Sequence, residues 1–534
     1  MPRAPGTPKL DLHRLSWHAH YARTLGPWLR DRLDLREARA MIQRGLQTRE
    51  QELLHTLKHG VYGQPDSPYL ALLRHAGAEY EDVARAVIDK GVEPALAQLY
   101  DAGVRITLDE LKTRVPITRP GLELHVNADA FTNPLIRADL HLTSGGTRGK
   151  PHPTLIDFRL LERDAAHMRL FQEATGILGR PIAAWRPSLP AGPGINHHLI
   201  HGKLGQRMER WFTQLSAWPP HESPRSGALL AATLAISRAS GVPFPFPRHV
   251  PLDHAVTVAR WLNGHVERGR PPFLNTTASG AVRVCEAAKA AGLDIEGAVF
   301  RVGGEPFTPA RARVISEAGC TAYPFLQANE VGRIGVTCAA RKHPDELHFL
   351  SDKLAVLRRD VDARTRRVEG SLVLTTLWGR APKLLLNVES DDTAVVETGP
   401  CGCPLGELGL TTRIHTVRSW EKLTTEGMTF TSSYTLRLVE EVLPERFGGG
   451  PTDYQLVEDR SGPLSKIRLL VSPRVGPADA TAVREAALEE LGADGPSGRF
   501  MAESWRAAGL PEVERREPYA TRRPKILPLH VIDG

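Results

Sequence analysis

The chain contains 534 residues, of which 41% are hydrophobic and 24% are charged. These values are typical of a globular enzyme with two or three structural units. The sequence has no run of about 18 apolar residues, so no membrane-spanning helix is predicted. The N-terminal segment lacks the apolar stretch of a secretory signal, and five cysteines in so long a chain indicate reduced thiols in the cytoplasm and not a disulfide framework. The net charge of +7 comes largely from arginines scattered among acidic residues, which indicates a surface suited to small anionic substrates and not a nucleic-acid interface.

Residues 21–111 carry apolar side chains at spacings of three and four, the period of amphipathic helices. The clearest example is the segment 80–103, where Gly103 is placed to end a helix. We therefore expect residues 1–110 to form a helical N-terminal layer of a large domain. The sequence leaves the role of this layer open.

After Pro116 short apolar runs alternate with helical patterns and glycine-rich turns. This alternation predicts an α/β core over residues 111–422, with ligands at the loops that leave the strand ends. Residues 185–251 are rich in proline, glycine and aromatic residues, and we expect irregular walls over a cleft there. Residues 423–534 have the length and pattern of a small α+β domain.

A glycine- and hydroxyl-rich run, "SGGTRGKP", follows an apolar alternation. It is not a Walker loop, because Pro151 follows the Gly-Lys pair and a serine stands where the first glycine is required. Backbone N–H groups of such a turn are suited to phosphate oxygens. The candidate phosphate ligands are Ser144, Gly145, Gly146, Thr147, Arg148, Gly149 and Lys150.

Further motifs follow this loop in order along the chain. They are "RVGGEPFT" with Gly303, Gly304, Glu305 and Pro306; "FLQANEVGRIG" with Asn329 and Glu330; "KLLLNVESDD" with Asp391 and Asp392; "IHTVRSWEKLTTEGMTF" with Arg418; and "RRPKILPLHVID" with Lys525. Together with the loop they resemble the ordered motifs of the adenylate-forming (acyl-CoA synthetase-like) enzymes, in the branch of phenylacetate–CoA ligases, acyl-protein synthetases and phenazine antibiotic biosynthesis proteins. The chain departs from the family at Gly145 and Arg148, and at Leu326, where an aromatic residue is usual.

The resemblance implies a large α/β domain of the adenylate-forming type and a small mobile C-terminal α+β domain. It implies that ATP and Mg²⁺ bind, that Glu330 holds the metal, and that Asp392, in preference to Asp391, holds the ribose. Lys525 would act as the catalytic lysine when the small domain closes. Arg418 and Leu423 would bound the hinge about which that domain rotates.

The acyl pocket is expected at His197, His198, Thr276, Ser279 and Phe325. For the histidines a surface loop is the alternative, and for Thr276 to Ser279 the alternative is an N-cap of the following helix. Zinc is not predicted at the three nearby histidines, because no acidic or thiol partner lies at a ligand spacing. In relatives a cysteine-rich insert at the position of Cys401 and Cys403 is structural, but here only two thiols are close in sequence.

The expected function is ATP-dependent activation of a carboxylic acid, an aryl or other small hydrophobic acid, to an acyl-adenylate with release of pyrophosphate. CoA is the default acceptor, and an amine, a protein thiol or activation of a non-carboxylate oxyanion are the alternatives. A non-catalytic nucleotide-binding relative is a second class of hypothesis. No nucleic-acid or membrane partner is expected, and a homodimer is compatible with the resemblance.

Overall fold

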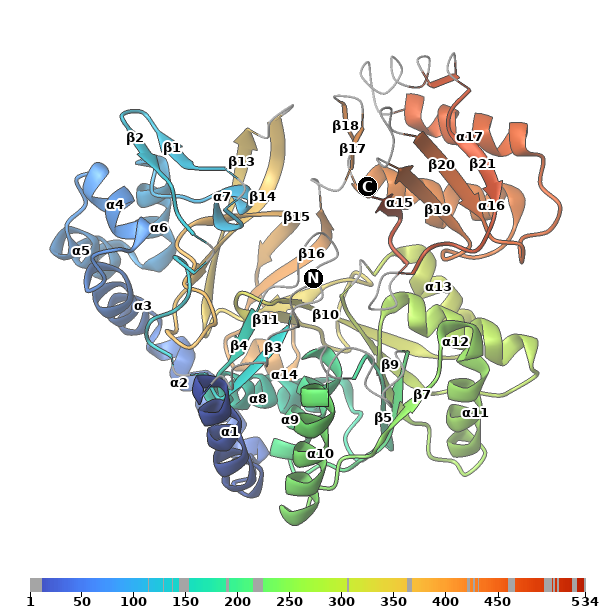
Figure 1. Ribbon diagram of the computed structural model, residues 1–534, viewed down its shortest axis with the longest axis horizontal. Helices are drawn as coiled ribbons and strands as arrows, with labels where there is room; N and C mark the ends of the chain where they lie inside the picture. Colours follow the sequence, from blue (N-terminus) through green and yellow to red (C-terminus); the bar gives the residue numbers. More distant parts are fainter. Residues whose placement is uncertain are drawn as a thin grey trace, which may run out of the picture.

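The computed structural model describes residues 12–113, 115–127, 129–136, 138–143, 153–188, 192–214, 224–304, 307–362, 367–419, 423–425, 428–430, 432–459, 466–493, 502, 505–506, 509–520 and 526–532. These residues form a large α/β domain with a smaller C-terminal α+β domain beside it (Figure 1). The fold class expected from the sequence is confirmed. Among the described helices, none is both long enough and apolar enough to cross a membrane.

Helices make up most of the first hundred described residues. Asp34 and Glu37 form a capping box at the start of the second helix, in which each side chain accepts a hydrogen bond from the other residue's N–H, at 2.7 and 2.9 Å. Leu53, Leu73 and Leu96 share one hydrophobic core with strand residues of the large sheet. The helices are α1 (Leu12–Arg30), α2 (Leu35–Gln47), α3 (Arg49–Leu57), η1 (Lys58–Tyr62), α4 (Pro68–His75), α5 (Tyr80–Lys90), α6 (Val92–Asp101) and α7 (Leu108–Leu111).

The large domain is built on a sheet that has 12 strands in the described part of the chain. In spatial order they are β13 (Leu354–Asp362), β14 (Arg367–Thr376), β15 (Val388–Thr398), β16 (Thr412–Ser419), β12 (Leu347–Phe349), β11 (Gly332–Val336), β10 (Thr321–Ala328), β9 (Val299–Val302), β8 (Phe273–Thr276), β5 (Ile182–Trp185), β6 (Met208–Thr213) and β7 (Pro247–His249). The pairs from β13 to β10 are antiparallel. The pairs from β10 to β7 are parallel.

The parallel half contains a topological switch point. From β5 the chain adds β6 and β7 on one side, and it then returns to add β8, β9 and β10 on the other side. At such a point the connections that leave two neighbouring strands run to opposite sides, which opens a crevice at their carboxyl ends. The space outside the carboxyl ends of β5 and β8 is therefore where the fold itself places a ligand.

The expectation of irregular walls over residues 185–251 is wrong. This stretch holds α9 (Gly192–Lys203), β6, α10 (Pro224–Ala239) and β7 in addition to the end of β5. Every residue of β5 is buried, as is most of β6. Strands covered on both faces lose the alternating pattern that reveals a strand in a sequence.

The remaining elements of the large domain cover the sheet or form short hairpins. The strands β3 and β4 pair antiparallel in a register that ends at Thr143 and Pro153, so the glycine-rich run connects their ends. The elements are β1 (Ile117–Arg119), β2 (Leu122–Leu124), β3 (Leu140–Thr143), β4 (Pro153–Ile156), α8 (Phe158–Thr175), η2 (Leu252–His254), α11 (Ala255–Val266), α12 (Ala278–Ala290), α13 (Pro309–Glu317) and α14 (Pro404–Glu407).

The C-terminal domain packs helices on a four-stranded sheet of order β21-β20-β19-β22. It docks on α13, where the buried Glu440 carboxylate forms an ion pair with Arg311 at 2.7 Å and accepts a hydrogen bond from Thr308. Its elements are β17 (Leu423–Thr425), β18 (Met428–Phe430), α15 (Ser432–Arg437), η3 (Leu438–Val442), α16 (Leu443–Phe447), β19 (Tyr454–Asp459), β20 (Lys466–Val471), α17 (Ala480–Gly492), β21 (Glu512–Arg515) and β22 (Leu529–Ile532).

Candidate active site at the carboxyl ends of the parallel strands

Arg186 joins three strand ends at the switch point. It directly follows β5, and its guanidinium donates hydrogen bonds to the carbonyl oxygen of Gly303 at 3.2 Å and to that of Thr276. Thr276 ends β8 and Gly303 follows β9. A single buried cation therefore fixes the ends of β5, β8 and β9 relative to one another.

The residues after β8 begin a helix. The hydroxyl of Thr277 accepts a hydrogen bond from Gly280 N–H at 2.9 Å and lies 3.2 Å from the Ser279 hydroxyl. The sequence alternative of an N-cap is confirmed at Thr277. Thr276 and Ser279 are both buried, so their hydroxyls line the beginning of α12 and not an exposed surface.

Phe325 lies among cationic side chains. The guanidinium carbon of Arg301 is 3.7 Å from the centre of its ring, and those of Arg186 and Arg333 are each 5.8 Å away. Gly303 packs against the same ring, because a Cβ atom there would fall 2.6 Å from it. The guanidinium groups of these buried arginines thus pack against the ring of Phe325.

The charge of Arg301 is poorly compensated. The side chain is 1% exposed, and among the described residues neither of its terminal nitrogens has a hydrogen-bond partner. Burial lowers the pKa of Arg301 well below its ordinary value, and repulsion from Arg333 and Arg186 lowers it further. An excess of positive charge at this edge of the sheet favours anionic ligands nearby.

The three histidines of α9 are buried, so the surface-loop alternative is wrong. His197 faces Phe325 with ring centres 6.0 Å apart, whereas His198 packs on Trp211 with ring centres 4.2 Å apart. Burial lowers the pKa of His197 well below its ordinary value and that of His198 to about 4, so both imidazoles are neutral near pH 7. Of the two, His197 lies beside the strand ends.

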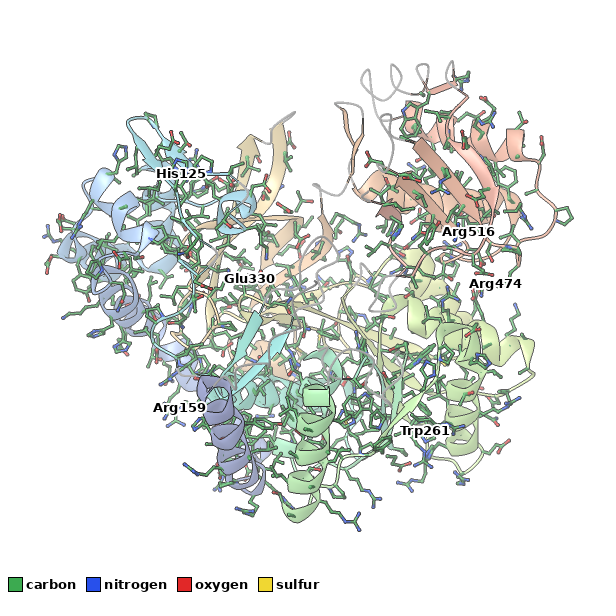
Figure 2. All side chains as sticks on the ribbon, in the orientation of Figure 1. His125, Arg159, Trp261, Glu330, Arg474 and Arg516 are labelled. Atoms are coloured by element: carbon green, nitrogen blue, oxygen red, sulfur yellow. The ribbon has the colours of Figure 1, made fainter. Side chains whose placement is uncertain are left out.

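Glu330 lies in the turn after β10, next along the same edge (labelled in Figure 2). Its carboxylate forms an ion pair with Lys112, at the end of α7, and its carbonyl oxygen accepts a hydrogen bond from Lys383 N–H at 2.9 Å. Burial raises the pKa of Glu330, but the charge and hydrogen bond of Lys112, a backbone hydrogen bond and the charge of Lys383 together outweigh burial, and the net pKa is lowered. Glu330 is therefore ionised and neutralised by a lysine. Asn329 precedes it in the same turn.

Asp392 and Arg418 lie on neighbouring strands, one position out of register, so their side chains point to opposite faces of the sheet. Asp392 of β15 is opposite Ser419 of β16, and Thr393 is opposite Arg418. Arg418 forms an ion pair with Asp345 at 3.1 Å. Successive strand residues point to opposite faces, so Asp391 and Asp392 are directed to different sides of the sheet at this point. Both are partly exposed.

Some predicted site residues lie outside the described residues. These are Ser144, Gly145, Gly146, Thr147, Arg148, Gly149, Lys150, Glu305, Pro306 and Lys525. Gly304, which begins the turn after β9, is described and has a φ of +85°, a backbone conformation that favours glycine.

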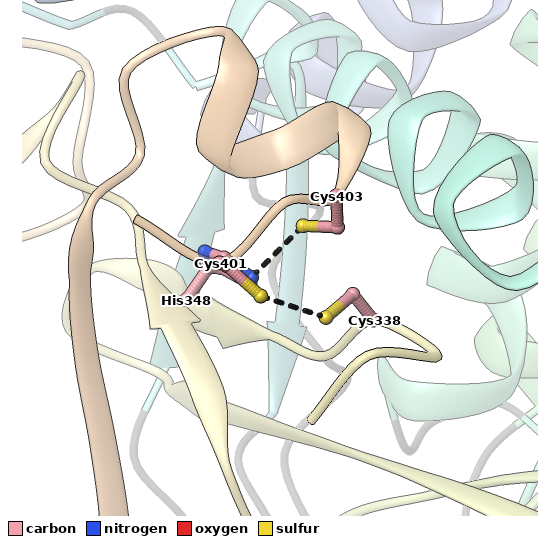
Figure 3. Close-up of side chains that lie close together, drawn as sticks. All are labelled: Cys338, His348, Cys401 and Cys403. Carbon is pink, nitrogen blue, oxygen red and sulfur yellow. Dashed lines mark hydrogen bonds between the residues drawn. The ribbon is translucent and has the colours of Figure 1, made fainter. Parts of the chain in front are cut away.

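A second group of reactive side chains lies away from the switch point. Cys338, His348, Cys401 and Cys403 converge, and their ligand atoms all lie within 4.8 Å of one another (Figure 3). Cys401 and Cys403 were the only pair visible in sequence. The other two come from the end of β11 and from β12, more than fifty residues earlier in the chain.

Arg186, Arg301, Arg333 and Lys112 were missed in the sequence. A signal existed for Arg301, because a charged residue inside a four-residue run of buried parallel strand requires a reason. Arg186 also stands directly after a buried strand. For Lys112 nothing local distinguishes the residue from a surface lysine.

No family model and no curated protein matches the chain. Solved structures do. 2-Hydroxyisobutyryl-CoA ligase in the postadenylation state is 16% identical over 95% of this chain and 92% of that chain, with a TM-score of 0.49. The amide bond synthetase McbA from Marinactinospora thermotolerans is 14% identical over 92% and 98%, with a TM-score of 0.39. ATP-bound MatB from Rhodopseudomonas palustris is 10% identical over 77% and 66%, with a TM-score of 0.38. Similarity at this level concerns the course of the chain and leaves substrate and acceptor open.

Proposed function

We propose that the chain is an adenylate-forming ligase, which activates a carboxylic acid with ATP to an acyl-adenylate and releases pyrophosphate. The observation that carries the proposal is the cationic edge at the switch point, where Arg186 ties together the ends of β5, β8 and β9. Both substrates of such a reaction are anions, and attack of one on the other requires that their charges be neutralised. The ordered motifs from Ser144 to Lys525 supply the second line of support.

The glycine-rich run from Ser144 to Lys150 is proposed to hold the β- and γ-phosphates through its N–H groups, hydroxyls and cations. The turn of Gly303 to Pro306 would pass against the adenine, and Asp392 would accept hydrogen bonds from the ribose hydroxyls. Arg148 adds a cation where relatives carry a small residue, and this cation would strengthen the grip on the departing pyrophosphate.

Mg²⁺ is proposed to arrive with ATP and to take one protein ligand, Glu330. A single carboxylate together with phosphate oxygens and water is the donor set that Mg²⁺ prefers, and Glu330 is ionised. Lys112 neutralises that carboxylate in the described structure. Lys112 would move to the phosphates as the metal takes its place, so the positive charge at Glu330 would be exchanged and not lost.

Lys525 is proposed to bridge the carboxylate and the α-phosphate when the small domain closes over the large one. The hinge would lie between Arg418 and Leu423. A rotation there would break the ion pair between Arg311 and Glu440 that holds the small domain on α13. His197, Thr276, Ser279 and Phe325 would border the acyl group, and His198 would support His197 from behind.

The acceptor is proposed to be CoA, with an amine or a protein thiol as alternatives, and the acid an aryl or other small hydrophobic acid. The segments "CPLGELG" and "SWEKLTTEGM" are closer in pattern to antibiotic-biosynthesis and acyl-protein synthetase relatives, which favours a place in specialised metabolism. The cysteine content carries the proposal of a cytoplasmic enzyme, and the resemblance carries that of a homodimer.

Pyrophosphate release across a panel of carboxylic acids tests the proposal. We expect acid-dependent release by the unaltered enzyme and a loss of roughly 100-fold or more in Lys525→Ala. Lys289→Ala, on an exposed position of α12, is the matched control and should retain activity. If no acid-dependent turnover is seen, and the parent and Lys525→Ala bind ATP equally well, the chain is a non-catalytic nucleotide-binding protein and the proposal is wrong.

A further inference from the structure

The thiols of Cys338, Cys401 and Cys403 and the imidazole of His348 meet from three separate segments of the large domain. Cys338 follows β11 and His348 lies on β12. Cys401 and Cys403 lie between β15 and α14, with Cys403 as the N-cap of α14. Gly402 between them has a φ of +69°, a turn that few other residues adopt and that brings both thiols to the same cluster.

The distances within the cluster match those expected around one tetrahedral ion. Cys338 Sγ lies 3.6 Å from Cys401 Sγ, and Cys403 Sγ lies 3.3 Å from His348 Nε2. Zinc bonds of about 2.3 Å to sulfur and 2.0–2.1 Å to nitrogen place two sulfurs roughly 3.8 Å apart and a sulfur and a nitrogen roughly 3.6 Å apart. A disulfide requires about 2.05 Å between the sulfurs, so the cysteines are not paired in that way.

Hydrogen bonds orient the ligands. His348 Nδ1 lies 2.7 Å from the carbonyl oxygen of Leu410, which can only accept a hydrogen bond, so Nδ1 carries the proton and donates it. Nε2 is then left with its lone pair directed at the thiols, the arrangement in which a backbone carbonyl fixes a metal-binding histidine. Gly406 N–H donates to Cys403 Sγ at 3.4 Å, as befits a sulfur that carries negative charge.

Three of the four ligands are buried, and Cys401 is partly exposed. Cys338 and His348 are each 1% exposed and Cys403 is 3% exposed. Cys338 and Cys403 belong to the same hydrophobic core as Leu350, Leu405 and Leu410. Four protein ligands leave no open position on the ion for a substrate, and this distinguishes a structural zinc site from a catalytic one.

We infer that Cys338, His348, Cys401 and Cys403 bind one structural Zn²⁺ ion. The ion fastens the connection between β15 and β16 to the strands β11 and β12, and so holds the antiparallel half of the sheet in register beside the turn of Glu330. The inference is independent of the reaction that the enzyme catalyses.

Metal analysis of the full-length protein purified without added metal tests the site. We expect one zinc per chain, and less than about a tenth of that in Cys403→Ser, because removal of one of four ligands exposes the site to exchange. Cys320→Ser is the matched control: it is buried, lies outside the cluster, and should retain the full zinc content.

Measurements on the unaltered chain test the site even if the Cys403→Ser variant folds poorly. Titration of the thiols with a mercurial should release one equivalent of zinc to a colorimetric chelator. Protein prepared with Co²⁺ should show a thiolate-to-cobalt charge-transfer band that Cys320→Ser keeps. Unaltered protein that holds less than a tenth of an equivalent of zinc and gives no such band with Co²⁺ would overturn the inference.

Discussion

Two buried clusters of charged side chains lie close together in the large domain, and they differ in how far positive and negative charges compensate one another. In the first, which we call the paired cluster, Asp164 binds Lys353 at 3.1 Å and Asp352 binds His167 at 3.0 Å, with Arg163 3.8 Å from Asp352. In the second, the cationic cluster, Arg186, Arg301 and Arg333 surround Phe325. The paired cluster contains its own counter-charges, whereas the carboxylate that attracts Arg301 and Arg333 is Asp164 of the paired cluster.

We propose that the paired cluster has a structural role and that the cationic cluster binds ligands. A balanced buried network holds its elements together, and it loses stability when one partner is removed. A buried excess of one sign costs stability in the protein alone, and it is retained where a ligand of opposite charge completes it. The paired cluster joins α8 to the residues after β12, and the cationic cluster extends from Arg186 at the switch point to β9, β10 and β11.

The largest effect is expected from breaking the paired cluster. Asp352→Ala leaves Arg163 and His167 without their carboxylate in a buried position, so we expect a loss of about 3–5 kcal/mol in the free energy of unfolding. Chemical denaturation measures this loss. Asp89→Ala, exposed on α5, should change stability by less than about 0.5 kcal/mol. An equally small loss in Asp352→Ala would mean that the paired cluster is not structural.

Arg301→Met should change the free energy of unfolding in the opposite direction. It removes a buried charge whose terminal nitrogens lack partners among the described residues, and it keeps apolar contact with Phe325, so we expect stability to rise by about 1–2 kcal/mol. Acid-dependent pyrophosphate release should fall by roughly 10-fold, because the field that attracts both anions is weakened.

Arg163→Met in the paired cluster is the comparison for Arg301→Met. It should lower stability, since it removes the partner of a buried carboxylate. If both arginine variants lose stability alike in denaturation curves, the contrast between the two clusters is wrong.

The last comparison concerns the interface between the domains, where negative charge is in excess. Burial raises the pKa of Glu286 on α12 to about 7, and repulsion from Asp453 of the small domain adds to the shift. The neighbouring Arg283, Arg474 (Figure 2) and Glu517 complete its surroundings. Because the buried carboxyl holds its proton more tightly than in the unfolded chain, its stabilising contribution is full below pH 4.5 and is lost as pH rises through about 7.

Glu286→Gln should remove this pH dependence. Thermal unfolding followed from pH 5 to pH 8 should show a fall in the parent chain that the variant lacks, with the greatest difference at the alkaline end. Glu81→Gln, on an exposed position of α5, should follow the parent. A fall of equal size in Glu286→Gln would assign the pH dependence to other groups.

Much of the proposed site was predicted from local patterns. Gly303, Glu330, Asp392 and Arg418 were selected by short motifs and their order along the chain, and their roles stay predictions. What the motifs did not predict are the neighbours from other segments. Lys112 reaches Glu330 from a helix more than two hundred residues earlier, and no local pattern encodes such a contact.

The sequence by itself determined the class of the fold, the helical first hundred residues, the small C-terminal domain and the line of candidate motifs, because periodicity, caps and glycine turns are local properties of the chain. Only the tertiary structure decided that Arg186 joins three strand ends, that His197 and not His198 faces Phe325, and that Cys338 and His348 complete a cluster with Cys401 and Cys403. The physical reason is that these contacts between distant segments depend on the order of the strands in the sheet. That order is set by burial over the whole domain and not by any single segment.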